Sequence, residues 1–273
     1  MILVTGASGF VGGKILQMRQ DAIASPSLRG MGEDDIKRML ERFDVDAVIH
    51  TAAISDTRVC QANPDESYRA NVQIPTFLAS ALKGTGIKLV CFSSDQVYTG
   101  TKEVGPFTEE KAKPANVYAE HKLEMEERVL DLIPSAVMLR AEWMYDYYLK
   151  KPNYFMNVIN ATDTLRFSSS VYRGVTYVKE VVENIDGVMR LPGGVYNFGS
   201  ETAKSIYEVT YDFLKLIGKD VRVDDVPVGC DLWMDCSKAK KCGIAFSSVE
   251  DGLKRCAEDY DVNFTRLAAC NQF

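Results

Sequence analysis

Tyr118 and Lys122 stand four positions apart in the stretch NVYAEHKLEMEER, which covers residues 116–128. On a helix this spacing brings the two side chains together on one face. A phenol beside an ammonium group could transfer a proton, because the positive charge favours the phenolate and lowers the tyrosine pKa from about 10. The pattern Tyr-x-x-x-Lys, however, is common by chance. Its surroundings must therefore decide between chemistry and plain structure.

The helix that carries this pair has an apolar face, and the pair lies on that face. Helical spacing of three and four residues joins one row of side chains: Tyr118, Lys122, Met125, Val129 and Leu132. The exposed acidic residues of the stretch fall elsewhere on the helix. A lysine that faces the core requires a partner or a ligand, which a surface lysine does not, and this favours a functional interpretation.

A second group of polar residues, Ser93-Ser94-Asp95-Gln96, follows the apolar run of residues 88–92. That run predicts a buried strand. In a parallel sheet its carboxyl end would present these side chains at a ligand-binding edge. The structural alternative for Ser94 is a loop hydroxyl that caps a turn.

A glycine-rich loop, TGASGFVG (residues 5–12), follows the first predicted strand and opens the first predicted helix. Its glycines allow a tight turn and a close approach to a pyrophosphate, and the helix N-terminus offers unpaired N–H groups. A simple tight turn between strand and helix is the alternative. The loop predicts a dinucleotide site.

The second predicted strand, residues 22–25, bears on the choice of dinucleotide. No Asp or Glu that could bind the ribose hydroxyl of NAD occurs in residues 22–32. Ser25, Ser27 and Arg29 could instead hold a 2′-phosphate, which favours NADP(H) over NAD(H). Arg29 could equally be a solvated loop charge.

The first half of the chain alternates strand and helix patterns. Short apolar runs predict strands at residues 2–5, 22–25, 47–50, 88–92 and 136–139. Helical periodicity predicts helices at residues 10–20, 33–43, 67–83 and 116–132. This alternation predicts an α/β fold with a Rossmann-type, doubly wound parallel sheet that binds ligands at the carboxyl ends of its strands.

The alternation becomes irregular after residue 139, which predicts a smaller C-terminal lobe interleaved with the sheet. A strand and a helix are expected in residues 173–189, a further strand at 194–198, and amphipathic helices at 205–217 and 249–260. We predict an NAD(P)-binding domain of residues 1–140 plus 171–200 and a substrate-binding lobe of residues 141–170 plus 201–273.

The composition is that of a globular protein, with 46% hydrophobic and 26% charged residues among 273 and a net charge of −6. No basic stripe suits nucleic acid or a membrane surface, and no apolar run approaches the roughly 18 residues of a membrane span. The N-terminus has no signal-peptide pattern. Seven cysteines without C-x-x-C and only two histidines argue against a metal site and suggest free thiols in the cytoplasm.

Several motifs together resemble a known family. TGASGFVG, HTAA (residues 50–53), FSSDQVY (92–98) and YAEHK (118–122) occur in the order and spacing of the extended short-chain dehydrogenase/reductase family. Within it, NVYAEHKLEMEE, RAEWMY (140–145) and GVYNFGS (194–200) are most similar to the dTDP-4-dehydrorhamnose reductases. The likeness covers residues 1–145 and 171–200 and is thin from about residue 220 onward.

The resemblance implies reduction of a ketone by NAD(P)H. Tyr118 would give a proton to the carbonyl oxygen, and Ser94 would donate a hydrogen bond to the same oxygen. Lys122 would assist the tyrosine and bind the nicotinamide ribose. The substrate would be a small molecule, a nucleotide sugar, and a homodimer would be compatible with the family.

The same likeness implies where the ligands would bind. The cofactor would be held by Gly6, Ser8, Gly9, Phe10, Val11, Gly12, Arg29, Thr51, Ala52, Ala53, Ser93, Tyr118 and Lys122. The substrate would meet Asp95, Gln96 and Trp143. Asn71 would stabilise the active-site helix or a water, or be an ordinary helix residue, and Arg140 lies where the family shapes its pocket.

Two departures from the family pattern bear on the substrate. Dehydratases of the superfamily carry an acidic pair where this chain has Asp95 and Gln96, and Gln cannot remove a proton, so dehydration is disfavoured. Residues 226–244 lack the arginine-rich segment expected of the rhamnose enzymes. Two alternatives stay open: epimerisation or oxidation of a nucleotide sugar on the same scaffold, and a cofactor-binding regulatory subunit without turnover, such as the beta subunit of methionine adenosyltransferase.

Overall fold

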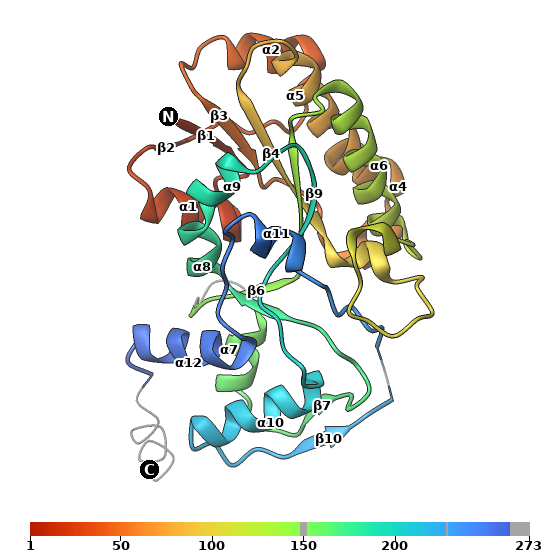
Figure 1. Cartoon of the computed structure of the whole chain (residues 1–273), viewed down its shortest axis with the longest axis vertical. Helices are drawn as coiled ribbons and strands as arrows, with labels where there is room; N and C mark the ends of the chain where they lie inside the picture. The colour runs from red at the N-terminus through yellow and green to blue at the C-terminus, as the bar shows by residue number, and fades with distance from the viewer. Residues whose placement is uncertain (148–151, 228, 263–273) are drawn as a thin grey trace.

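The centre of the molecule is a six-stranded sheet in which neighbouring strands run parallel (Figure 1). The computed structural model describes residues 1–147, 152–227 and 229–262. Across the sheet the strands are β2 (Ala22–Ala24), β1 (Ile2–Thr5), β3 (Ala47–His50), β4 (Lys88–Ser94), β5 (Val137–Ala141) and β9 (Gly194–Phe198). The sheet winds outward in both directions from β1, whose carboxyl end marks the switch point where such sheets bind ligands. The predicted doubly wound parallel sheet is confirmed.

Helices cover both faces of this sheet (Figure 1). One face carries α1 (Phe10–Met18), α8 (Val178–Glu183) and α9 (Ile185–Arg190), and the other carries α2 (Glu33–Leu40), α5 (Ile74–Leu82) and α6 (Val117–Leu132). Each layer closes over its own apolar core, with Ile15 and Val181 fully buried in the first and Ile36 and Leu78 in the second. The strands are buried on both faces, which is why their sequences read as nearly continuous apolar runs.

The helix expected over residues 67–83 differs from the prediction. The chain here forms α3 (Thr57–Ala62), α4 (Pro64–Tyr68), one π-helical turn η1 (Arg69–Gln73) and then α5. Pro75 has no N–H to bond the carbonyl of Asn71, four residues earlier, so the regular helical ladder cannot continue. The N–H of Ile74 bonds a carbonyl five residues back instead. Turns of this kind are frequent at functional sites.

A smaller lobe lies at the carboxyl edge of the sheet, beneath it in Figure 1. The chain enters it directly after β5. Its elements are β6 (Trp143–Tyr145), α7 (Tyr154–Ile159), β7 (Leu165–Phe167), β8 (Val175–Tyr177), α10 (Ile206–Leu216), β10 (Val223–Asp225) and α12 (Val249–Asp259). A separate apolar cluster that includes Tyr145, Phe155, Phe213 and Leu253 forms its core. The short α11 (Ser237–Lys241) packs back against β9.

Two further findings concern the described part of the chain. Its six cysteines are free thiols, whereas Cys270 lies outside the described residues. None of its helices combines the length and apolar character needed to span a bilayer.

Candidate functional site

The glycine loop turns at the carboxyl end of β1 and packs against the segment that follows β3. Gly6 has a φ of +74°, a backbone conformation that favours glycine. A Cβ on Gly6 would lie 2.7 Å from the backbone N of Ala52, and one on Gly12 would lie 2.5 Å from the carbonyl O of Gly6. The loop has no room for side chains at these positions. Its bare backbone forms the kind of cradle that a pyrophosphate requires.

The N-terminus of α1 completes this cradle. The N–H of Gly9 is donated to the carbonyl of Gly6 at 2.8 Å, and α1 begins at Phe10 without a side-chain cap. Ser8 is exposed beside it. The uncapped N–H groups and the positive end of the helix dipole suit an anionic ligand. These residues therefore fit the pyrophosphate of a dinucleotide.

Replacement of Gly6 by Ala is expected to weaken NADPH binding by about tenfold or more and to destabilise the fold by about 1–3 kcal/mol. The new Cβ would collide with the backbone of Ala52, and the alanine would have to adopt a left-handed backbone conformation. Gly30→Ala is the matched control, because Gly30 also has a positive φ but open space around its Cβ position. Calorimetric titration and thermal unfolding measure both effects. Equal losses of cofactor affinity in the two variants would contradict the steric argument.

The segment after β3 is fastened from two sides. Thr51 donates its hydroxyl to the carbonyl of Thr5 at 2.7 Å. Asn71, in the π-helical turn, accepts the N–H of Ile54 at 3.1 Å and donates its amide to the carbonyl of Ile54 at 3.0 Å. The segment containing Thr51, Ala52 and Ala53 is thereby held beside the glycine loop. Asn71 thus fixes this segment through its two hydrogen bonds to the backbone of Ile54.

Tyr118 lies in the first turn of α6, which Asn116 caps. Burial raises the pKa of its phenol above the ordinary value, a hydrogen bond with Ser94 opposes this rise, and the charge of Asp95 adds to it. Tyr118 is therefore a protonated phenol at neutral pH, which is the form that can donate a proton. The sequence predicts that Lys122 and an oxidised nicotinamide together lower the pKa of Tyr118. In the chain without cofactor the pKa is raised instead, because burial is the largest effect.

Ser94 ends β4 and begins the short helix η2 (Asp95–Tyr98). Its hydroxyl oxygen accepts the N–H of Gln96 at 3.2 Å, and the hydroxyl donates to Oδ1 of Asp95 at 3.2 Å. Ser94 thus caps a turn, as the structural alternative has it. It also faces Tyr118, so two hydroxyl groups stand together at the carboxyl edge of the sheet.

Lys122 lies one turn after Tyr118, with its Nζ 5.9 Å from the centroid of the tyrosine ring. Its ammonium donates to the carbonyl of Phe92 at 2.8 Å, which is the partner that a buried lysine requires. Burial lowers the pKa of Lys122 to about 8. His50 is bonded to the hydroxyl of Thr5 at 2.7 Å, and burial together with the charge of Lys122 lowers its pKa to about 3. His50 is thus neutral and bonded to the residue that begins the glycine loop.

Ser93 belongs to a buried network beneath the site. Its hydroxyl donates to Glu126 at 2.5 Å, and Glu126 accepts two hydrogen bonds from Arg140, from Nε at 3.0 Å and from Nη2 at 2.7 Å. Arg140 also donates to the hydroxyl of Tyr98 at 2.9 Å. The charge of Arg140 is therefore directed into the interior, where it joins β4, β5 and α6. The cofactor contact expected of Ser93 stays a prediction.

Arg173 belongs to no motif of the sequence, yet it lies beside the predicted site. Its Nη2 donates to Oδ2 of Asp95 at 2.6 Å, and its guanidinium lies 3.6 Å from the ring centroid of Trp143. Arg173 and Asp95 are both buried, whereas Trp143 is 45% exposed. The pair brings together two residues predicted to meet substrate, Asp95 and Trp143. An arginine directly before a glycine and a strand was the only signal in the sequence.

Glu142 is a second buried group that the motifs did not identify. Thr176 donates its hydroxyl to Oε1 of Glu142 at 2.5 Å, and the N–H of Ser200 donates at 3.0 Å. Burial raises the pKa of Glu142 to about 8. A Cβ on Gly174 or Gly199 would meet this carboxyl, so the two glycines make room for it. In the sequence, the available signal is an acid three residues beyond the strand predicted at residues 136–139.

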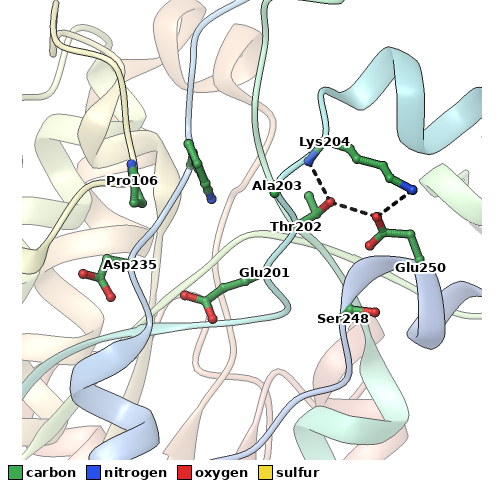
Figure 2. A pocket seen from close by; sticks show the side chains of 9 residues that line it. Pro106, Glu201, Thr202, Ala203, Lys204, Asp235, Ser248 and Glu250 are labelled. Carbon is green, nitrogen blue, oxygen red and sulfur yellow. Dashed lines mark hydrogen bonds and ion pairs between the residues drawn. The ribbon is translucent and has the colours of Figure 1, made fainter.

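A hollow of about 690 Å³ lies between Pro106 and the lobe (Figure 2). Thr202 and Lys204 are both bonded to Oε1 of Glu250, at 3.2 Å and 3.4 Å, as Figure 2 shows. The hollow is lined by none of Ser94, Tyr118 and Lys122. The candidate chemistry is therefore separate from this hollow and lies at the edge of the sheet.

Comparison of the whole sequence with known families identifies the family of this chain. The family of the RmlD substrate binding domain matches residues 1–230, which is most of the chain. The chain belongs to this family. The matched residues include the glycine loop, Ser94, Tyr118 and Lys122, and the resemblance to the dTDP-4-dehydrorhamnose reductases is confirmed.

Relatives of this RmlD-family chain carry several names. "Probable low-salt glycan biosynthesis reductase Agl14" of Haloferax volcanii is 25% identical, covering 92% of this chain and 91% of the relative. Methionine adenosyltransferase 2 subunit beta of Xenopus tropicalis is 27% identical, covering 89% and 82%. The solved structure of dTDP-4-dehydrorhamnose reductase from Bacillus anthracis in complex with NADP has a TM-score of 0.83 at 19% identity, covering 94% of this chain and 97% of that one. The structural likeness establishes a shared fold.

Proposed function

We propose that this chain is an NAD(P)H-dependent reductase of a keto-sugar nucleotide. The observation that carries the proposal is the convergence of the hydroxyls of Ser94 and Tyr118 with the ammonium of Lys122 at the carboxyl edge of the sheet. The glycine cradle at the same edge supports a dinucleotide cofactor. NADP(H) is favoured because residues 22–32 contain no acid and because the related Bacillus anthracis enzyme was solved with NADP.

The dinucleotide would supply a hydride to the carbonyl carbon of the substrate. In the proposed reaction Tyr118 donates its phenolic proton to the carbonyl oxygen, and Ser94 donates a hydrogen bond to that oxygen as negative charge develops on it. Lys122 stabilises the phenolate that remains and binds the nicotinamide ribose. A tyrosine that is protonated at neutral pH is suited to this direction of reaction.

We propose that residues 1–140 plus 171–200 bind the cofactor and that residues 141–170 plus 201–273 form the substrate-binding lobe. Of the lobe, residues 148–151, 228 and 263–273 lie outside the described residues. Trp143 stands where the chain passes from β5 into this lobe, and its exposed ring offers a face for a sugar to pack on. Asp95 and Gln96 follow β4 at the same edge.

One specific observation favours a second function, that of a cofactor-binding regulatory subunit without turnover. The methionine adenosyltransferase subunit beta aligns over 89% of this chain at 27% identity. The intact set of Ser94, Tyr118 and Lys122 supports turnover instead. Binding alone requires no proton donor.

The test is nicotinamide absorbance of the purified chain with a panel of 4-keto nucleotide sugars, run with NADPH and with NADH. We expect at least one sugar to oxidise the cofactor, with NADPH the better donor. Tight NADPH binding by calorimetry without oxidation across the panel would support the regulatory subunit. Interconversion of sugars without net cofactor oxidation would support an epimerase.

A further inference from the structure

Arg173 is a buried cation at the edge of the proposed active site. Its pair with Asp95 spans 2.6 Å, and the two side chains are 7% and 3% exposed. Among the described residues its Nε has no hydrogen-bond partner, although it is buried. Burial of a guanidinium is unfavourable unless the charge is paired, so this arrangement is no incidental surface contact.

The partner of Arg173 touches the reactive hydroxyls directly. Asp95 accepts a hydrogen bond from Arg173 at Oδ2 and one from the hydroxyl of Ser94 at Oδ1. Ser94 in turn faces the phenol of Tyr118, whose pKa it lowers. One carboxylate therefore connects the guanidinium to both groups that would meet the substrate oxygen.

The charges around this carboxylate and around Tyr118 come from different elements. Glu142, after β5, interacts electrostatically with both Asp95 and Arg173, and burial raises its pKa to about 8. Tyr118 faces Asp95 and the thiol of Cys60, with Lys122 one turn away. Arg173 is the cation in direct contact with Asp95, so it balances the negative charge nearest to the phenol.

We propose that Arg173 is a positioning residue, which holds and neutralises Asp95 so that Asp95 binds the Ser94 hydroxyl only weakly, at 3.2 Å, and Tyr118 meets no unpaired negative charge. The proposal rests on the proposed reduction and adds a member to its site. Without Arg173, Asp95 would compete more strongly with the substrate for the single Ser94 proton. Burial raises the pKa of Asp95 and the charge of Arg173 opposes that rise. Where Asp95 is ionised, its uncompensated charge would also disfavour the Tyr118 phenolate and make the tyrosine a weaker acid.

Kinetics of Arg173→Gln test this role. We expect kcat at neutral pH to fall about 10- to 100-fold. The alkaline limb of the kcat–pH profile should move to higher pH by about one unit, and KM for NADPH should stay unchanged. Arg173→Lys should recover part of the rate, because it retains the charge but not the planar fork. The double variant Asp95→Asn, Arg173→Gln should return the limb toward its original position. An unmoved limb in Arg173→Gln, or a double variant no closer to the wild type, would overturn the proposal.

A readout without turnover separates this proposal from the proposed function. With NADP⁺ bound, the tyrosinate absorbance that Tyr118→Phe removes reports the titration of Tyr118, and Arg173→Gln should shift it to higher pH. If the wild type reduces no carbonyl compound, the proposed function fails while this shift still tests Arg173. Should Arg173→Gln not fold, Asp95→Asn should move the titration to lower pH, and no movement would be decisive against the link.

Discussion

Tyr118→Phe is expected to lower kcat for carbonyl reduction about 100- to 10,000-fold while leaving NADPH affinity nearly unchanged. The substitution removes one hydroxyl and leaves the ring in its buried place on α6. Ser94 is the hydroxyl next to it, but a serine hydroxyl is a far weaker acid than a phenol. Steady-state kinetics give kcat, and calorimetric titration gives the dissociation constant of NADPH.

Tyr154→Phe is a matched control for this prediction. Tyr154 is a buried tyrosine of the lobe, and its hydroxyl lies 2.8 Å from the hydroxyl of Thr210. Its loss should cost about 1 kcal/mol of stability and leave kcat in place. If Tyr118→Phe kept the wild-type rate, or if both variants lost activity alike, the assignment of Tyr118 as proton donor would be wrong.

The reactive row on α6 could be predicted because it depends on local periodicity. Once residues 116–132 form a helix, Tyr118 and Lys122 must share a face with Met125 and Val129, and these four side chains are buried in the structure. The position of Ser94 follows from the same kind of argument. A polar residue at the end of an apolar strand reaches the carboxyl edge of a parallel sheet wherever the strand lies in that sheet.

Arg173 and Glu142 could not be predicted in the same way, because their partners are distant in sequence. Asp95 and Arg173 are 78 residues apart, and they meet only because β6 and β8 pair beside the end of the sheet. Glu142 is held by Thr176 and by the backbone of Ser200, which depend on the same packing. No spacing rule connects such residues, so these contacts required the tertiary structure.

The π-helical turn is an intermediate case. Pro75 was visible inside the predicted helix of residues 67–83, and a proline there removes a regular hydrogen bond. The prediction of one continuous helix over residues 67–83 is therefore wrong at this point. The turn lies near the candidate site, because it places Asn71 against the segment beside the glycine loop.

The Asp95–Arg173 pair also strengthens the argument about reaction type. Elimination on this scaffold needs a carboxylate free to remove a proton, and Gln96 cannot provide one. Asp95 is the remaining carboxyl of that motif, but both of its oxygens are engaged, by Arg173 and by Ser94. This arrangement disfavours elimination and supports the proposed reduction.

Lys122→Met is expected to weaken NADPH binding and kcat by about tenfold or more each, and yet to stabilise the fold. Burial lowers the pKa of Lys122 to about 8. Relative to an ordinary lysine pKa of about 10.4, this shift corresponds to a destabilisation of about 3 kcal/mol at pH 7. Loss of the hydrogen bond to Phe92 offsets about 1 kcal/mol of the gain. The net increase in unfolding free energy should be about 1–3 kcal/mol.

The pH dependence of this gain distinguishes a buried charge from a simple packing effect. Between about pH 8 and pH 10.4 the unfolded wild type binds more protons than the native state, so wild-type stability rises with pH. The advantage of Lys122→Met should therefore be full below pH 8 and shrink as the pH rises through that window. Urea unfolding at pH 7 and at pH 10 measures it. Lys88→Met, at the start of β4 and remote from the reactive hydroxyls, should leave kcat intact. A Lys122 variant with unchanged NADPH affinity, or with a stability gain that is equal at both pH values, would contradict the role of Lys122 as the buried cation of the site.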